Sequence, residues 1–194
     1  TGAARRARFV IGGDCFDKGP SNLRLLRTLN RLHKRGAKLR LLAGNHDIRV
    51  MLGMRSVGQY RNESNEHFFL RMGPKAVPLI REISGCYVDK ADMKHLPSNK
   101  QVRKLLYPSA EWTERFPAVA GDCMSASAVQ REIEKIIKKV ERFERQCEIH
   151  HISMKQVYAA TLQWQKMFLR RGGEIYWFYN RMRLFYRQGS FLFI

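Results

Sequence analysis

The fold is decided by residues 8–47, which read RFVIGGDCFDKGPSNLRLLRTLNRLHKRGAKLRLLAGNHD. The apolar run 8–11 ends at Gly12-Gly13, which predicts a short strand running into a tight loop. A second apolar run, from Leu39 to Ala43, ends at Gly44 and predicts a second strand of the same kind.

The segment between these strands has the pattern of an amphipathic helix. Ser21 is a typical N-cap, and Gly36 closes the helix after about Arg35. The predicted apolar face is formed by Leu25, Leu26, Leu29 and Leu32. A strand, a helix and a strand in so short a segment form a βαβ unit, whose strands are parallel. Both loops that follow the strands are therefore expected at the same sheet edge, where α/β proteins usually form their sites.

Polar side chains follow each strand directly, in the segments Gly13–Gly19 and Gly44–Asp47. Glycine permits a sharp turn and a close backbone approach to a bound group. Asp and Asn supply hard oxygen ligands, and His can bind metal or donate a proton. Turn formation alone would explain either segment, but it does not predict that the two occur as a pair.

The two segments read G-D-x-x-D-K-G and G-N-H-D, and Asp14 and Asn45 are 31 positions apart. In this order and spacing they resemble two sequence blocks of the calcineurin-like metallophosphoesterases, which include protein Ser/Thr phosphatases. The resemblance implies an α/β sandwich fold and a hydrolase that cleaves phosphate esters with two metal ions, with manganese, iron or zinc expected.

The resemblance also implies roles for individual residues. Asp14 would bridge the two metals, and Asn45 would bind one of them. His46 would protonate the leaving oxygen, and Asp17 would hydrogen-bond its ring and keep it charged, since a carboxylate partner raises an imidazole pKa. Lys18 would contact the substrate phosphate, where the commonest family pattern has the two-pronged Arg. Asp47 is expected to stabilise its loop rather than to bind metal.

Two family blocks have no counterpart in this chain. The Asp-x-His block expected before the first strand and the later Gly-His-x-His block are both missing, and none of the other five histidines fits them. The chain starts at Thr1, and the apolar run Phe191–Ile194 resembles a buried strand cut off without a turn. These features predict an interior fragment that binds metal poorly and is inactive alone.

The domain prediction follows from the change of pattern after the second strand. Residues 1–57 are expected to form the first part of the α/β core, with its βαβ unit. Residues 58–187 are expected to form a large, mainly helical insertion that caps the metal edge and selects the substrate. Residues 188–194 are expected to begin the returning core strand. A capping box is predicted at Ser127-x-x-Gln130 for the insertion's long amphipathic helix.

Composition limits the partners. Lys and Arg total 36 against 17 acidic residues, a net charge of +19, which favours phosphorylated substrates, of protein or small-molecule type, and nucleic acid. Four scattered cysteines and the lack of an apolar run long enough for a membrane span indicate a cytoplasmic protein.

Two alternatives to a phosphomonoesterase remain open at this stage. The positive charge, together with the basic helix face from Arg24 to Arg35, is compatible with a phosphoesterase that acts on nucleic acid. The missing blocks are compatible with a non-catalytic basic interaction module derived from the same fold.

Overall fold

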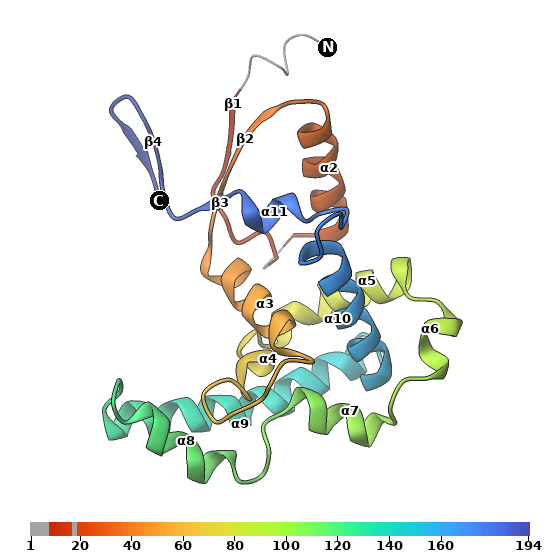
Figure 1. The fold of residues 1–194 in the computed structure, drawn as a ribbon, viewed down its shortest axis with the longest axis vertical. Coiled ribbons are helices and arrows are strands. Elements are labelled where there is room, and N and C mark those ends of the chain that lie inside the picture. Colours follow the sequence, from red (N-terminus) through yellow and green to blue (C-terminus); the bar gives the residue numbers. More distant parts are fainter. Residues whose placement is uncertain (1–7, 17–18) are drawn as a thin grey trace.

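A computed structural model describes residues 8–16 and 19–194 of the chain. Its larger sheet has three parallel strands in the order β1 (Arg8–Ile11), β2 (Lys38–Leu42) and β3 (Met182–Arg183) (Figure 1). β1 and β2 pair from Arg8 opposite Lys38 to Ile11 opposite Leu41. The parallel pair confirms the predicted βαβ unit and the α/β fold class.

Helix α2 (Asn22–Lys34) connects β1 to β2. Ser21 caps it as predicted, because its side chain accepts a hydrogen bond from the Arg24 N–H. Leu26 and Leu29 are buried, whereas Leu25 is 36% exposed. The predicted apolar face is thus rotated slightly, since adjacent helical positions lie about 100° apart and cannot both face the sheet.

A second group also caps the start of α2, and it comes from far along the chain. The Glu82 carboxylate, in helix α5 (Val77–Tyr87), accepts hydrogen bonds from the backbone N–H groups of Asn22 and Leu23 at 2.9 and 2.8 Å. It also accepts from the Ser21 hydroxyl at 2.8 Å. A negative charge is favourable at a helix N-terminus, so Glu82 fixes the α/β unit on the helical part.

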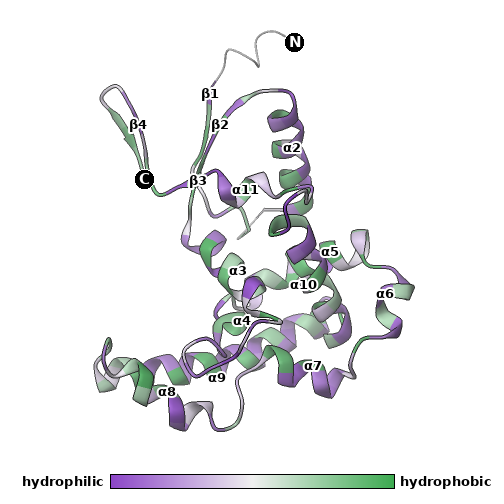
Figure 2. Ribbon diagram, viewed as in Figure 1, coloured by the Kyte–Doolittle hydropathy of each residue, from purple (hydrophilic) through white to green (hydrophobic). Residues whose placement is uncertain are grey.

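The chain between β2 and β3 is mainly helical, as predicted. It contains α3 (Asn45–Ser56), α4 (Phe68–Arg71), the 3₁₀ turn η1 (Pro74–Ala76), α5, α6 (Lys90–Lys94), α7 (Asn99–Leu106), α8 (Trp112–Ala120), α9 (Ala126–Ile149), α10 (Met154–Phe168) and α11 (Trp177–Asn180). Their apolar faces turn inward and their polar faces outward (Figure 2).

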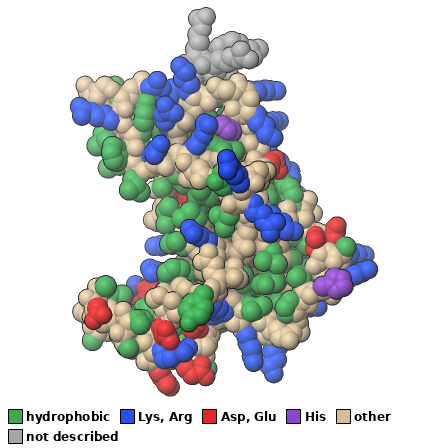
Figure 3. Space-filling view, viewed as in Figure 1, with side chains coloured by type: hydrophobic (Ala, Val, Ile, Leu, Met, Phe, Trp, Pro, Cys, Tyr) green, Lys and Arg blue, Asp and Glu red, His purple; other side chains and the backbone are tan. Residues whose placement is uncertain are grey.

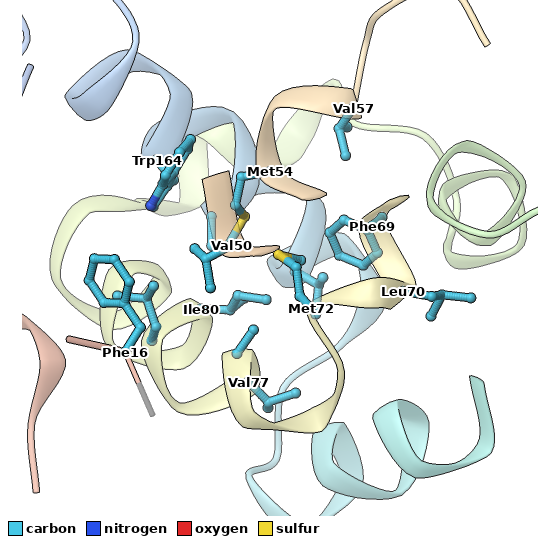
Figure 4. Packing of buried hydrophobic residues seen from close by; sticks show 14 of the residues in the cluster. Phe16, Val50, Met54, Val57, Phe69, Leu70, Met72, Val77, Ile80 and Trp164 are labelled. Atoms are coloured by element: carbon cyan, nitrogen blue, oxygen red, sulfur yellow. The ribbon is translucent and has the colours of Figure 1, made fainter. Parts of the chain in front are cut away.

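One continuous core runs through both predicted regions (Figure 4). Phe16, from the loop after β1, packs against Phe168 of α10 and Phe178 of α11, with ring centroids 6.3 and 5.6 Å apart. Val50 and Met54 of α3 belong to the same buried cluster. The helical part therefore packs directly against the elements that carry the two polar loops.

Two local predictions are wrong. The long helix α9 begins one residue after Ser125, whose side chain accepts from the Ala128 N–H. Ser127 therefore lies inside the helix and does not cap it. The sequence offers two serines two positions apart, and propensity alone does not distinguish them.

The strand that returns to the main sheet also differs from the prediction. β3 lies at Met182–Arg183, inside the region expected to be insertion. The apolar run at the end forms β5 (Phe191–Phe193), which pairs antiparallel with β4 (Tyr186–Gln188) in a separate hairpin. Phe191 is 72% exposed, so residues 188–194 do not form a buried core strand.

Candidate metal-binding and catalytic site

Two loops meet at the carboxyl ends of β1 and β2, and glycines allow this close approach. Gly13 has φ +87°, and a Cβ there would lie 2.5 Å from the Gly44 nitrogen. A Cβ on Gly44 would lie 2.2 Å from Asp14 Oδ1. No other residue fits at these two positions without moving the backbone.

The Asp47 side chain connects the two loops through hydrogen bonds. Its Oδ2 accepts from the N–H groups of Asp14 at 2.8 Å and Gly44 at 3.0 Å, and its Oδ1 accepts from the Cys15 N–H at 2.9 Å. The residue is fully buried. Burial raises the pKa of its carboxyl group, against the three N–H donors that lower it. The expected structural role of Asp47 is confirmed.

Cys15 lies beside this carboxylate and is buried. Burial first, and then the charges of Asp47 and Asp14, raise the pKa of its thiol to about 12. A thiol with so high a pKa stays neutral and is a poor nucleophile. Cys15 therefore serves packing at this edge.

Asp14 is held in an unusual conformation at the mouth of the site. Its φ is +51°, a left-handed backbone that Asp tolerates better than most residues. Its Oδ1 accepts a hydrogen bond from the His46 N–H at 3.0 Å, while the side chain stays exposed. A strained and exposed carboxylate that is fixed by its surroundings is typical of a functional position.

Asn45 and His46 begin helix α3, immediately beside Asp14. Asn45 is exposed and His46 is half-buried. The start of a helix favours negative charge, because its first N–H groups lack partners within the helix. The structure thus brings Asp14, Asn45 and His46 to one edge of the sheet. The predicted roles of Asp17 and Lys18 fall outside the described residues and stay predictions.

The donor set fits part of a metal site. The Asp14 carboxylate and the Asn45 amide oxygen are hard ligands of the kind that divalent metals accept. Among residues 8–16 and 19–194 no group of three or more His, Cys, Asp or Glu is placed to hold a metal. A hard cation normally takes at least four ligands, so Asp14 and Asn45 alone would not complete such a site.

A further residue of the site escaped the sequence analysis. Arg49 lies four residues after Asn45, which places both on the same face of α3. It lines an open pocket of about 180 Å³ together with Leu52, Phe68 and Arg71. This spacing was visible in the sequence, but Phe68 and Arg71 come from α4, which no local pattern connects to α3.

A further cation, which does not line the pocket, lies next to Arg71. The Lys139 ammonium of α9 donates to the Arg71 carbonyl at 2.7 Å. Burial lowers the pKa of Lys139, and the neighbouring charges of Arg49 and Arg71 lower it further. Arg71 also forms an ion pair with Glu132 at 3.4 Å. The pocket therefore combines an apolar wall with a surplus of cations.

Taken together, the two glycine loops and the start of α3 bring Asp14, Asn45 and His46 to one edge of the parallel sheet. In agreement with this, a family model described as calcineurin-like phosphoesterase matches residues 4–122. The match spans more than half of the sequence, and the chain belongs to this family. The comparisons with curated proteins and with solved structures gave no match.

Membership supports metal-dependent phosphoesterase activity in general and marks the protein as a hydrolase. The match continues past residue 57 as far as α8, so the family's likeness includes part of the helical region. No helix in the described part of the chain is long and apolar enough to cross a membrane.

Proposed function

We propose that this protein hydrolyses phosphomonoesters through a two-metal site, with Asp14 and Asn45 as ligands. The observation that supports this most is the hydrogen bond from the His46 N–H to Asp14 Oδ1, at 3.0 Å. It places the carboxylate from one loop against the helix start from the other. Such a metal pair, of manganese, iron or zinc, supplies activation of water and neutralisation of phosphoryl charge.

The remaining steps fall to side chains of this chain. His46 donates a proton to the leaving oxygen, and Asp17 orients the ring. Lys18 holds a phosphate oxygen as a point charge. Asp14 and Asn45 hold their geometry through Asp47, which positions both loops without contacting the substrate.

The pocket of Arg49, Leu52, Phe68 and Arg71 begins one helical turn along α3 from Asn45, and we infer a role for it in substrate choice. Its apolar wall and its arginines suit an ester whose leaving group carries an aromatic or aliphatic part and a second negative charge. A phosphorylated peptide and a small phosphorylated metabolite both meet this description.

The test is hydrolysis of an aryl phosphate with added manganese. Asp14→Asn removes the metal-binding charge and keeps the shape of the side chain, and should lower kcat/KM by at least about 100-fold. Asp122→Asn is the matched control, because Asp122 is exposed between α8 and α9.

Activity that is lost in Asp14→Asn and kept in Asp122→Asn would support the proposal. A folded and metal-loaded protein without activity would contradict it and favour the non-catalytic interaction module.

A further inference from the structure

Positive charge is concentrated in one part of the molecule. Residues 8–42 and 170–194, which contain the sheet, α2, α11 and the hairpin, carry 14 basic and three acidic side chains. Residues 43–169, which are about twice as many residues as the first group, carry 20 basic and 14 acidic side chains. Figure 3 agrees, since the red acidic side chains on this face gather mainly over its lower and right-hand parts. We call the first group of residues the basic lobe.

The basic lobe contains a pocket in which arginines and aromatic rings are combined. It has a volume of about 520 Å³ and lies between β2 and the hairpin, and its lining is Leu39, Arg40, Arg181, Arg183, Phe185, Tyr186 and Arg187. All four arginines are exposed. Phe185 is 63% exposed, so part of its ring is open to a ligand.

Tyr186 is held in place by two of the surrounding cations. The Arg8 and Arg40 guanidinium groups lie 5.9 and 5.5 Å from the centre of its ring. Arg8 also donates to the Tyr186 hydroxyl at 2.6 Å. These contacts fix the hairpin against the sheet and make the pocket a built feature of the fold.

A second basic groove lies along α2, in the same basic lobe. It has a volume of about 570 Å³ and is lined by Arg24, Arg27, Asn30, Arg31, Lys34 and Glu174. Its one acidic group, Glu174, accepts a hydrogen bond from Asn30 at 3.2 Å. Arg181, which lines the pocket, has its guanidinium 3.5 Å from His33 Nδ1 of α2, the helix that carries the groove. His33 in turn stacks on Trp177 at 4.2 Å.

The combination of exposed arginines and aromatic rings in this pocket distinguishes among the possible polyanionic partners. Phosphorylated proteins and anionic membranes need the positive charge, but neither needs flat rings inside a concave site. Single-stranded nucleic acid needs both, because arginines track its phosphates and aromatic side chains stack on its unpaired bases. Because the hairpin also exposes aliphatic residues, a membrane surface is the main alternative partner. The experiment must therefore distinguish binding to nucleic acid from binding to membranes.

We propose that the pocket between β2 and the β4–β5 hairpin binds single-stranded nucleic acid. Phe185 stacks on a base, and the arginines from Arg40 to Arg187 contact phosphates. The site lies outside the candidate metal edge, and the proposal does not depend on phosphatase activity.

The experiment is fluorescence anisotropy of a short labelled oligo(U) with the protein over a range of salt concentrations. Arg181→Gln/Arg183→Gln should weaken binding and make the slope of log K against log salt shallower by about 1.4. Phe185→Ser should weaken binding by about 5- to 150-fold with little change in slope, since it removes stacking and no charge.

The control is Lys138→Gln/Arg142→Gln, which removes two exposed charges from α9, outside the basic lobe. It should leave affinity within about twofold, since those charges are not at the site. The same variants are tested on phosphatidylserine vesicles, and circular dichroism confirms that each is folded.

The proposal is overturned if oligo(U) does not bind, if the α9 control weakens binding as much as the pocket variant, or if Phe185→Ser has no effect. Binding to vesicles that requires Phe185, without binding to oligo(U), would assign the pocket to membranes instead.

Discussion

Replacing Asp47 by alanine removes a buried side chain that joins the two loops of the candidate site. Three backbone N–H groups lose their acceptor, those of Asp14, Cys15 and Gly44. A buried donor without a partner costs about 1–3 kcal/mol. Only the bond to Cys15 is fully buried, so water can replace part of the other two.

The net effect is smaller than the sum of three bonds, because the native state also bears the cost of burying the carboxylate, which raises its pKa. We expect Asp47→Ala to lower the free energy of unfolding by about 3 kcal/mol, which corresponds to about 6–12 °C in Tm for a chain of this size. Asp47→Asn keeps one oxygen acceptor and should cost about half as much.

Urea unfolding followed by circular dichroism measures this, with the m-value checked for constancy between variants. Asp122→Ala is the control, since an exposed substitution away from such features should change the free energy of unfolding by less than about 0.5 kcal/mol. A loss below about 0.5 kcal/mol for Asp47→Ala would refute the reasoning, because the three hydrogen bonds would then contribute nothing.

Three further predictions use the same measurements or the phosphatase assay. Gly44→Ala should destabilise the protein by about 1–3 kcal/mol, because the new methyl group meets Asp14 Oδ1; Gly85→Ala, in open space within α5, should not. His67 is buried with a pKa lowered to about 4, by burial and by the charges of Arg71 and Lys139. As the pH is lowered, the unfolded state therefore takes up a proton before the folded state does. The free energy of unfolding should fall by up to about 3 kcal/mol between about pH 6.5 and 4. His67→Phe should show a shallower fall. Arg49→Gln should raise KM for a phosphate ester with a second negative charge by about 5- to 10-fold and change KM little for one without it.

The βαβ unit could be predicted because local signals agree there. The apolar run 8–11 predicts the bounds of β1, and the cap at Ser21 predicts the start of α2, each to within one residue. Parallel pairing then brings the loops of Asp14 and Asn45 to one edge, so most of the candidate site follows from topology.

The parts that could not be predicted depend on contacts between distant segments. Glu82 lies 60 residues from Asn22, and nothing in its own helix indicates that it caps α2. β3 has two residues, too few for a periodic pattern. The run Phe191–Phe193 has the hydrophobicity of a core strand but pairs with β4, because hydrophobicity does not specify which partner a strand finds.

The Asp47 carboxylate has a consequence for how the site opens. The amide hydrogens of Asp14, Cys15 and Gly44 are all donated to one side chain, so displacement of that side chain would expose all three together. In amide hydrogen exchange the three should share one opening free energy and respond together to denaturant. The two loops would then form a single cooperative unit, and a metal that binds to either of them would protect both.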